Sequence, residues 1–388
     1  MALTQMRIGI IGAGIAGLTS AIALTRRGAD VEIFEQAEDF AEVGAGIQIS
    51  ANALRVLTDL GIDLKDAIPC GTPQAVNLRG ARGMLLSRTP LNTQPDHPYY
   101  QVHRADFIAL LAEQARAAGV TLNMGQPALA DGGAGSIRIN GVAHDFDLVV
   151  AADGVRSPTR MAFLDGIEPA FTGQVAWRAL VPMPQGAEVW RDTNVYMGLG
   201  RHVVFYGLRD QTLLNIVAVE RRKSWTAEGW DIPDSGANMR AHFLGFSADV
   251  RAALDQVTAP KLWGLFDHPP LNSWSRGNLV VVGDAAHPML PYMAQGACMG
   301  IEDAWVLADS LDQTTEIPSA LQRYEMLRKP RCSALQRAAK SNGRLFHISN
   351  PLARRTATVG LKITSTLAPG LLRRRTDWIY NHDVTRPL

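Results

Sequence analysis

Three glycines near the N-terminus constrain the fold of this chain more than any other feature. Gly12, Gly14 and Gly17 stand in the stretch "GAGIAG", after a short apolar run, "MRIGII". A stretch with helical periodicity, "IAGLTSAIALTRRG", continues from it, and a second apolar run, "ADVEIFE", follows. This order of strand, glycine turn, helix and strand predicts a βαβ unit over residues 6–35.

The same glycines indicate a dinucleotide. Gly12 permits the tight turn, Gly14 lets a pyrophosphate approach the backbone, and Gly17 lets the helix pack on the sheet. The unpaired N–H groups and the dipole of the helix N-terminus attract phosphate. Glu35 ends the second strand, where a carboxylate binds the ribose hydroxyls of FAD or of NAD. The contacts expected from this segment are those of Gly12, Gly14, Ile15, Ala16, Gly17, Glu35 and Gln36.

The rest of the chain changes in pattern several times. Helices are expected over 50–61 and 104–119, and the "NG" of "RINGV" gives the turn of a β-hairpin. From about Phe171 to Lys261 apolar and polar residues alternate, as in a half-exposed sheet. The stretch "NLVVVGDAA" is again a buried strand, and the chain is mostly helical from about Gly296.

The overall charge gives no sign of a nucleic-acid or membrane partner. Among 388 residues, 38 Lys and Arg balance 37 Asp and Glu, a formal net charge of +1. The three cysteines, Cys70, Cys298 and Cys332, are too scattered for a disulfide framework or a metal site, which favours a reducing compartment. The N-terminal segment lacks the pattern of a targeting peptide, and no apolar run is long enough to span a bilayer. We therefore expect a cytoplasmic protein without a metal. A monomer and a homodimer are both compatible with the sequence.

Two later motifs bear on which dinucleotide the chain binds. The stretch "AADGVRSPTR" at 151–160 carries an Asp-Gly pair, and "GDAAHPMLP" at 283–291 carries a Gly-Asp pair. Together with "GAGIAG", and in this order, they resemble the three signatures of the single-component (group A) FAD-dependent aromatic hydroxylases. The stretches "EVGAGIQISANALRVL", "VHRADF", "VAWRALVP" and "DWIYNHD" resemble the branch of that family that hydroxylates salicylate and 6-hydroxynicotinate. The resemblance covers nearly the whole chain.

The predicted fold class is α/β. We expect a Rossmann-like FAD-binding domain, with a parallel sheet and helices, an inserted β-sheet domain for the substrate, and a helical C-terminus. The expected boundaries are 1–170 and 271–345 for the two parts of the FAD-binding domain, 171–270 for the inserted sheet and 346–388 for the C-terminal helical segment.

The resemblance also implies roles for single residues. Asp284 binds the ribityl or ribose part of FAD, Arg104 reaches the flavin–phosphate region, and Asp153 and Arg160 connect the FAD site with the docking surface for reduced nicotinamide. From the residues alone, Asp153 also fits a turn cap, and Arg104 a surface cation at a helix start. Gly296 opens a helix whose first N–H groups stabilise the negative charge of reduced flavin. The remaining cofactor contacts are expected from Gly46, Pro291, Ala297 and Cys298.

The reaction of the family defines what the protein must supply. NADH or NADPH reduces FAD, O2 then gives a flavin C4a-hydroperoxide, and the electron-rich ring of a small aromatic substrate attacks its distal oxygen. The protein positions the substrate, excludes water and deprotonates or polarises a ring hydroxyl, a task that suits histidine. The expected substrate is a phenol or hydroxypyridine, with an aromatic acid favoured.

The stretch "RHVVFYG" supplies the candidate catalytic residues. His202 and Tyr206 share one face of an alternating strand, and the branch that hydroxylates 6-hydroxynicotinate carries His and Tyr at this separation. Gln48 stands where that branch has a histidine implicated in catalysis. Its amide forms hydrogen bonds but is no general base, which argues against assigning the activity of that branch to this chain unchanged. Either Arg178 or Arg201 suits a substrate carboxylate, and either also suits a salt bridge. Trp177, Pro291, Met293 and Gln295 are further candidates for pocket walls, although core or loop packing is the default expectation for Trp177 and Met293.

Three other functions fit parts of the sequence. An epoxidase, or a hydroxylase of non-phenolic rings, would share the architecture, and a flavin-binding redox module without turnover would share the FAD motifs. Asp284, His287 and Cys298 also suggest a cysteine hydrolase. The three FAD motifs argue against the hydrolase.

Overall fold

The computed structural model describes residues 3–40, 45–91, 96–133, 135–163, 168–184, 188–225 and 232–386. The first three residues of the stretch "EVGAGIQISANALRVL" therefore lie outside the described residues. The predicted βαβ unit is confirmed: β1 (Arg7–Ile11) and β2 (Asp30–Phe34) pair in parallel, joined by α1 (Ile15–Thr25). No helix among the described residues is both long and apolar enough to cross a membrane.

Two glycines of the first motif are required by close approach of the backbone. Gly12 has a φ of 100°, and a Cβ there would lie 2.5 Å from the carbonyl oxygen of Ala152. A Cβ on Gly17 would lie 2.0 Å from the carbonyl oxygen of Gly12. These distances are shorter than any van der Waals contact, so a side chain at either position would push α1 away from the strands.

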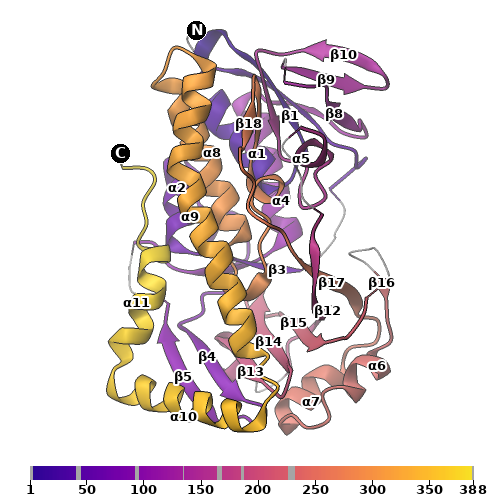
Figure 1. Cartoon of the computed structure of the whole chain (residues 1–388), viewed down its shortest axis with the longest axis vertical. Helices are drawn as coiled ribbons and strands as arrows, with labels where there is room; N and C mark the ends of the chain where they lie inside the picture. The colour runs from indigo at the N-terminus through magenta and orange to yellow at the C-terminus, as the bar shows by residue number, and fades with distance from the viewer. Residues whose placement is uncertain are drawn as a thin grey trace.

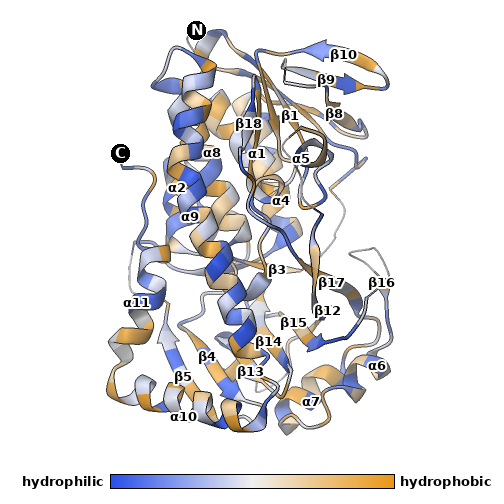
Figure 2. Ribbon diagram, in the orientation of Figure 1, coloured by the Kyte–Doolittle hydropathy of each residue, from blue (hydrophilic) through white to orange (hydrophobic). Residues whose placement is uncertain are grey.

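The FAD-motif half of the molecule is built on a mostly parallel sheet of six strands among the described residues (Figure 1). The order is β18 (Ser275–Arg276), β19 (Leu279–Val281), β11 (Leu148–Ala151), β1, β2 and β7 (Thr121–Asn123), with β18 antiparallel to β19. The strands around β1 are coloured largely as hydrophobic (Figure 2), as expected of a sheet covered on both faces.

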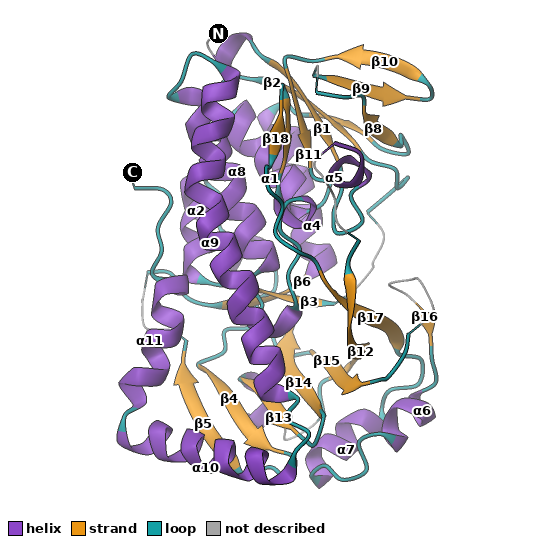
Figure 3. Cartoon of the chain, viewed as in Figure 1, coloured by secondary structure: helices purple, strands orange, loops and turns teal. Residues whose placement is uncertain are grey.

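A second sheet, with eight strands in the part of the chain that the structure describes, forms the other half of the molecule (Figure 3). Its order is β16 (Ile232–Pro233), β17 (Lys261–Asp267), β12 (Ala170–Pro182), β15 (Leu213–Arg221), β14 (Arg201–Leu208), β13 (Thr193–Met197), β4 (Ala75–Gly80) and β5 (Leu85–Pro90). β4 and β5 lie inside the range 1–170, yet a parallel pairing of β4 with β13 adds them to this sheet. The domain boundaries themselves stay a prediction.

Two small sheets complete the strands. β8 (Ala128–Ala130), β9 (Ser136–Ile139) and β10 (Val142–Asp145) form an antiparallel sheet, with the predicted hairpin between β9 and β10. β3 (Gly46–Ile49) pairs with β6 (Tyr100–His103) between the two large sheets.

The helices cover the sheets and close the C-terminal side. Their bounds are α2 (Ala51–Asp59), α3 (Leu64–Ala67), α4 (Arg104–Ala118), α5 (Pro158–Phe163), α6 (Gly236–Ala241), α7 (Ala248–Asp255), α8 (Gly296–Asp312), α9 (Ile317–Phe346), α10 (Pro351–Leu367) and α11 (Pro369–Tyr380). Short 3-10 turns lie at η1 (Leu3–Gln5), η2 (Glu188–Arg191), η3 (Gly283–Ala285) and η4 (Pro291–Met293). The helices expected over 50–61 and 104–119 are confirmed, as is the helical C-terminal part.

The packing of α1 against α4 and α8 places the FAD motifs. α1 packs against α4 and α8, and a Cβ on Gly300 of α8 would lie 2.9 Å from the Cβ of Ala16. α9 runs the length of the molecule and alternates hydrophilic and hydrophobic turns (Figure 2). α10 and α11 pack against β5 at the far end of the second sheet. The close contact of α1 with α8 holds the starts of these two helices side by side, and this brings the first and last FAD motifs together.

Candidate functional site

A cavity of about 1160 Å³ lies where the two large sheets meet. It is larger than the 300–1,000 Å³ that a drug-sized ligand usually occupies, so it has room for a dinucleotide and a small substrate together. The lining comes from the start of α1, from β3, β12 and β14, from the loop before α8, and from α9 and α11. The cavity is therefore the place at which all three sequence motifs and the predicted aromatic pocket converge.

The glycine motif offers an open cradle at one end of this cavity. Gly14, Ile15 and Ala16 line it, and a Cβ on Gly14 would meet nothing within 4 Å. The backbone at the start of α1 is thus free to be approached by a phosphate. Glu35 does not line the cavity; its carboxylate accepts hydrogen bonds from the N–H of Ala13 at 2.8 Å and of Ala37 at 2.9 Å, with acceptor capacity left over.

The Asp-Gly and Gly-Asp motifs are joined by one arginine. Nη1 of Arg160 donates to the carbonyl oxygens of Asp284 at 3.1 Å and Ala285 at 3.2 Å, while Nη2 donates to the carbonyl oxygen of Val155. Asp153 accepts from the N–H of Thr159 at 3.2 Å with one oxygen. Its other oxygen is buried and has no hydrogen-bond partner among the described residues.

The carboxylate of Asp284 opens into the cavity at the end of β19. No described residue donates a hydrogen bond to it, and the protein that encloses it raises the pKa of Asp284, although His287, Arg104 and Arg160 oppose that rise. An acceptor in this position suits a sugar hydroxyl. The open Gly14, the free oxygens of Asp153 and Asp284 and the cavity volume all fit FAD.

The predicted cofactor residues divide into two groups. Those that line the cavity are Gly14, Ile15, Ala16, Gly46, Arg104, Arg160, Asp284, Pro291, Gly296 and Ala297. Those that do not are Gly12, Gly17, Glu35, Gln36, Asp153 and Cys298. Gly12 and Gly17 are required for the packing of α1. The cofactor contacts of all these residues stay predictions.

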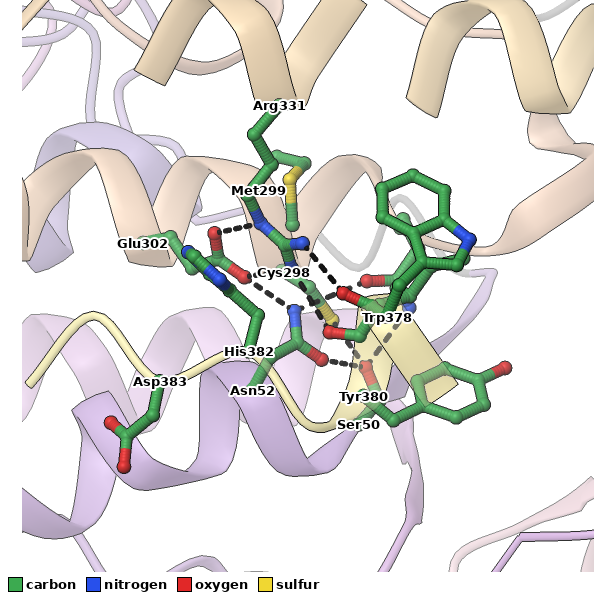
Figure 4. A network of polar contacts seen from close by, with 12 residues as sticks. Ser50, Asn52, Cys298, Met299, Glu302, Arg331, Trp378, Tyr380, His382 and Asp383 are labelled. Carbon is green, nitrogen blue, oxygen red and sulfur yellow. Dashed lines mark hydrogen bonds and ion pairs between the residues drawn. The ribbon is translucent and has the colours of Figure 1, made fainter. Parts of the chain in front are cut away.

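A buried polar network holds the start of α8 (Figure 4). Gln295, at the N-cap of α8, donates to Ser50 at 2.9 Å; Ser50 donates to Asn52 at 2.6 Å, and Asn52 donates to Glu302 at 2.6 Å. Arg331 of α9 grips Glu302 with two hydrogen bonds of 2.8 Å and also donates to the carbonyl oxygens of the C-terminal segment 378–379. Side chains of α2, α8 and α9, together with the C-terminal segment, thus fix the start of α8, where Gly296 and Ala297 line the cavity.

Ion pairs complete this network below the cavity. Arg328 is buried and bonds both Glu302 and Asp303. Burial alone would raise the pKa of Glu302 and of Asp303, but the charge of Arg328, with Arg331 or His287, holds each pKa at about 2. Glu302 and Asp303 are fully buried, so this pairing is what keeps them ionised inside the protein.

Asp284, His287 and Cys298 do not form the acid, base and nucleophile of a cysteine hydrolase. Nε2 of His287 lies 2.5 Å from Asp303, and the Cys298 thiol donates to the backbone oxygen of Gln48 at 3.4 Å. Burial raises the pKa of Cys298 to about 11, so the thiol stays protonated. Asp303, His287 and Cys332 lie close enough for a metal, but Arg328 already neutralises Asp303.

The predicted catalytic residues lie together on the cavity wall. Gln48, His202 and Tyr206 all line it, together with the predicted substrate residues Arg178, Pro291 and Met293. Tyr206 donates to the carbonyl oxygen of Gly46 at 2.6 Å and shares a side-chain hydrogen bond with Gln48, whose Oε1 accepts from Tyr99 at 2.6 Å.

Two of the candidate pocket residues, Arg201 and Trp177, do not line the cavity. Arg201 donates to the carbonyl oxygen of His242 and does not line the cavity. Trp177 is fully buried among the side chains on the other side of the sheet and donates to Asp234 at 2.7 Å. In an alternating strand Arg178 must face opposite to Trp177, which is why only one of these neighbours reaches the cavity.

Sequence motifs mark neither Tyr99, which lines the cavity, nor His347, which lies outside the lining and contacts His202. Tyr99 precedes β6, and Tyr380 of α11 lies against it with ring centroids 5.8 Å apart. Tyr380 belongs to the late stretch "DWIYNHD", which the family resemblance did single out. His347, at the end of α9, contacts His202 from 145 residues away, and no local pattern marks it.

Comparison with known proteins agrees with this geometry. A family model described as an FAD binding domain matches residues 5–339. The chain is 35% identical over 366 residues to a 3-amino-4-hydroxybenzoate 2-monooxygenase of Streptomyces platensis, covering 88% of this chain and 89% of the relative. It is 33% identical over 360 residues to the 6-hydroxynicotinate 3-monooxygenase of Bordetella bronchiseptica, covering 89% and 93%.

A solved structure extends the match to the fold. A salicylate hydroxylase in complex with its substrate superposes with a TM-score of 0.82 and 28% identity, covering 98% of this chain and 96% of that one. The motifs, the cavity and these relatives agree. The chain belongs to the FAD binding domain family and, within it, to the group A FAD-dependent aromatic hydroxylases.

Proposed function

We propose that this enzyme uses NAD(P)H and O2 to hydroxylate a small phenolic or hydroxypyridine carboxylic acid. The observation that carries the proposal is the placement of a cation and a neutral imidazole on one wall of the cavity. In the strand register, Arg178 of β12 pairs with Val217 of β15, which in turn pairs with Val204 of β14. His202 and Tyr206 lie two residues before and after Val204, on the same face of β14. Strand β12, which carries Arg178, lies two strand spacings, about 10 Å, from strand β14, which carries His202.

Arg178 is suited to the carboxylate of such a substrate. Its guanidinium stacks on the ring of Trp263 at 4.2 Å, which fixes the plane of the fork. A fork held in one plane binds a carboxylate with two parallel hydrogen bonds. The carboxylate would thereby anchor one end of the ring and direct the ring hydroxyl toward β14.

His202 is suited to receive that hydroxyl. Burial, together with the neighbouring His347, holds the pKa of His202 well below its ordinary value, so its imidazole is neutral and carries one lone pair. A phenolate formed beside it would favour the imidazolium and return the pKa upward. Transfer of the substrate proton to His202 is therefore favoured only while an acidic hydroxyl is bound. The stabilisation of the imidazolium thus occurs in the reacting complex and not in the free enzyme.

Tyr206 and Gln48 orient the hydroxyl rather than deprotonate it. The Tyr206 hydroxyl donates to Gly46, and burial raises the pKa of Tyr206, so its proton is retained. Because the oxygen of Gln48 already accepts from Tyr99, its NH2 group is the part available to Tyr206 and to a ligand. Gln48 thus acts as a donor, where a histidine would offer a base.

The cofactor side of the cavity completes the function. Bound FAD supplies the electrons from NAD(P)H and the electrophilic oxygen from O2. Gly296 and Ala297, at the start of α8, line the cavity, and their N–H groups would stabilise negative charge on a bound flavin ring. The apolar side chains of Val204, Val217 and Leu290 keep the reacting region dry.

A substrate screen tests this function. Purified holoenzyme is given NADH or NADPH with salicylate, 6-hydroxynicotinate or 3-amino-4-hydroxybenzoate, and with the same rings lacking the hydroxyl. Hydroxylated aromatic acids should accelerate NAD(P)H oxidation and yield a product with one added oxygen, while the matched rings without a hydroxyl should not. Epoxides from alkene substrates would support the epoxidase alternative, and reduction that no aromatic ligand accelerates would support a redox module.

A further inference from the structure

His202, which lines the cavity, and His347, which lies behind it, form a buried imidazole pair. Nδ1 of His202 lies 3.1 Å from Nε2 of His347, and Nδ1 of His347 lies 2.9 Å from the carbonyl oxygen of Gly343. The two side chains are 2% and 5% exposed. We propose that His347 is a positioning residue that locks His202 in the tautomer with a proton on Nδ1 and a lone pair on Nε2.

The direction of these hydrogen bonds follows from chemistry. A carbonyl oxygen only accepts, so Nδ1 of His347 must carry the proton that it donates to Gly343. A neutral imidazole has one N–H, so Nε2 of His347 is an acceptor. The partner at 3.1 Å, Nδ1 of His202, must therefore be the donor. His202 lines the cavity, and Nε2 is the ring nitrogen left for a ligand.

The neutral state of His347 is favoured by its surroundings. Burial lowers the pKa of His347 to about 4, the bond to Gly343 opposes this, and the nearby charge of Arg221 adds to it. A charged His347 would instead donate to His202 and place the proton of His202 on Nε2. At neutral pH the charged form of His347 is rare, because the pKa of His347 is about 4.

The end of α9 holds His347 rigidly against the loop before α8. A Cβ on Gly343 would lie 2.6 Å from the ring of Tyr292, so the helix touches that ring through its bare backbone. Gln336 donates to the carbonyl oxygen of Pro288 at 2.9 Å, and Asn342 to that of Tyr292 at 3.3 Å. The imidazole pair is thus tied to the same loop that carries the Gly-Asp motif.

The pair does not form a proton relay, because the chain of hydrogen bonds ends at a backbone carbonyl. It resembles instead the orienting arrangement in which a third group fixes the tautomer of a histidine base. The tautomer stands independently of the proposed function. Its effect on turnover rests on that function, in which Nε2 of His202 receives the substrate hydroxyl.

The tautomer is measured directly by nitrogen-15 NMR of histidine-labelled holoenzyme near neutral pH. Coupling of the ring nitrogens to the ring carbon-bound protons identifies which nitrogen is protonated, and loss of one signal set in His202→Gln assigns His202 among nine histidines. The proposal expects protonated Nδ1 and unprotonated Nε2. A protonated Nε2 on His202 in the wild type overturns it, whatever the substrate screen shows.

Two variants separate the orienting role from packing. His347→Phe keeps a ring but removes the acceptor, whereas His347→Gln keeps an amide oxygen for His202 and an amide N–H for Gly343. We expect His347→Phe to retain FAD and ligand affinity, to lose the single tautomer, and to lower kcat about tenfold or more. His347→Gln should restore the tautomer and most of the turnover.

A control and contrary outcomes complete the test. Phe346→Leu removes another ring from the same cluster, 5.3 Å from His202, and should leave the tautomer unchanged. Equal turnover in His347→Phe and wild type overturns the proposal. Equal losses in His347→Phe and His347→Gln with the His202 tautomer intact in both also overturn it. A wild type that hydroxylates no aromatic acid contradicts the proposed function alone.

Discussion

Arg160 and Asp284 are joined across 124 residues of sequence by a hydrogen bond of 3.1 Å, from the guanidinium of one to the backbone carbonyl of the other. The same guanidinium also reaches Ala285 and Val155, so three carbonyl oxygens from two FAD motifs depend on it. Burial lowers the pKa of Arg160, with Asp153 and Asp284 opposing, but the guanidinium stays charged. The arginine therefore sets the spacing of two loops.

Replacing Arg160 should weaken FAD binding without unfolding the protein. Arg160→Met fills the same space but leaves those carbonyls without a donor, and a hydrogen bond from a charged group is worth about 1.5–3 kcal/mol. We expect the Kd for FAD, measured by fluorescence titration of the apoprotein, to rise about tenfold or more. Arg116→Met, on the exposed face of α4, is the control. Equal Kd values in both variants would show that Arg160 does not shape the FAD site.

Two neighbouring glycines should fail in different ways. Gly14→Ala adds a methyl group that meets no protein atom within 4 Å, so the stability of the apoprotein should be unchanged while FAD binding falls. Gly17→Ala places a Cβ 2.0 Å from the carbonyl oxygen of Gly12, which should destabilise the protein by about 1–3 kcal/mol or more. Thermal unfolding of both apoproteins and FAD titration separate the effects. A destabilised Gly14→Ala that binds FAD normally would be inconsistent with the cradle.

The ion pairs of Glu302 should make the protein acid-sensitive over a defined range. Its pKa is about 2 in the folded protein and 4.5 in an unperturbed carboxyl, so its contribution to stability is full above pH 4.5 and is lost as pH falls toward 2. Glu302→Gln leaves Arg328 and Arg331 undercompensated and should cost about 3–5 kcal/mol at neutral pH.

Urea unfolding at a series of pH values measures this dependence. The difference between wild type and Glu302→Gln should shrink as pH falls from 4.5 toward 2, because the wild-type carboxyl is then protonated as well. Glu113→Gln, on the exposed side of α4, is the matched control and should parallel the wild type. A difference that stays constant down to pH 2 would refute the ion-pair account.

The aromatic pocket should affect turnover and not the cofactor. His202→Ala removes the proton acceptor and should lower kcat about a hundredfold, within the usual range for a general base. Tyr206→Phe removes a hydroxyl that orients the substrate and should cost about tenfold. Both proteins should retain FAD after gel filtration. Wild-type kinetics in both variants would mean that the hydroxyl is received elsewhere.

The local parts of the fold could be predicted from the sequence. The glycine motif between two apolar runs determines β1, α1 and β2, because each element there is specified by residues within a few positions. Alternation in "RHVVFYG" likewise put His202 and Tyr206 on one face, and both line the cavity. Such features depend on backbone periodicity alone.

The long-range parts could not. The parallel pairing of β4 with β13 joins strands more than a hundred residues apart, and no pattern inside either strand specifies its partner. His347 contacts His202 only because α9 ends where it does. From the sequence, Arg178 and Arg201 both fit a substrate carboxylate, and Trp177 fits a pocket wall as well as the core. The tertiary contacts show that Arg201 and Trp177 bond to His242 and Asp234 and do not line the cavity.

Turnover under heavy-isotope O2 tests the central claim most directly. The holoenzyme is given NAD(P)H and the hydroxylated aromatic acid that most accelerates its oxidation, in ordinary water under labelled oxygen, and the product is weighed by mass spectrometry. The account predicts a product that carries one labelled oxygen, formed by the wild type and greatly reduced in His202→Ala with FAD still bound. A product oxygen drawn from water, or NAD(P)H oxidation without any oxygenated product, would contradict it.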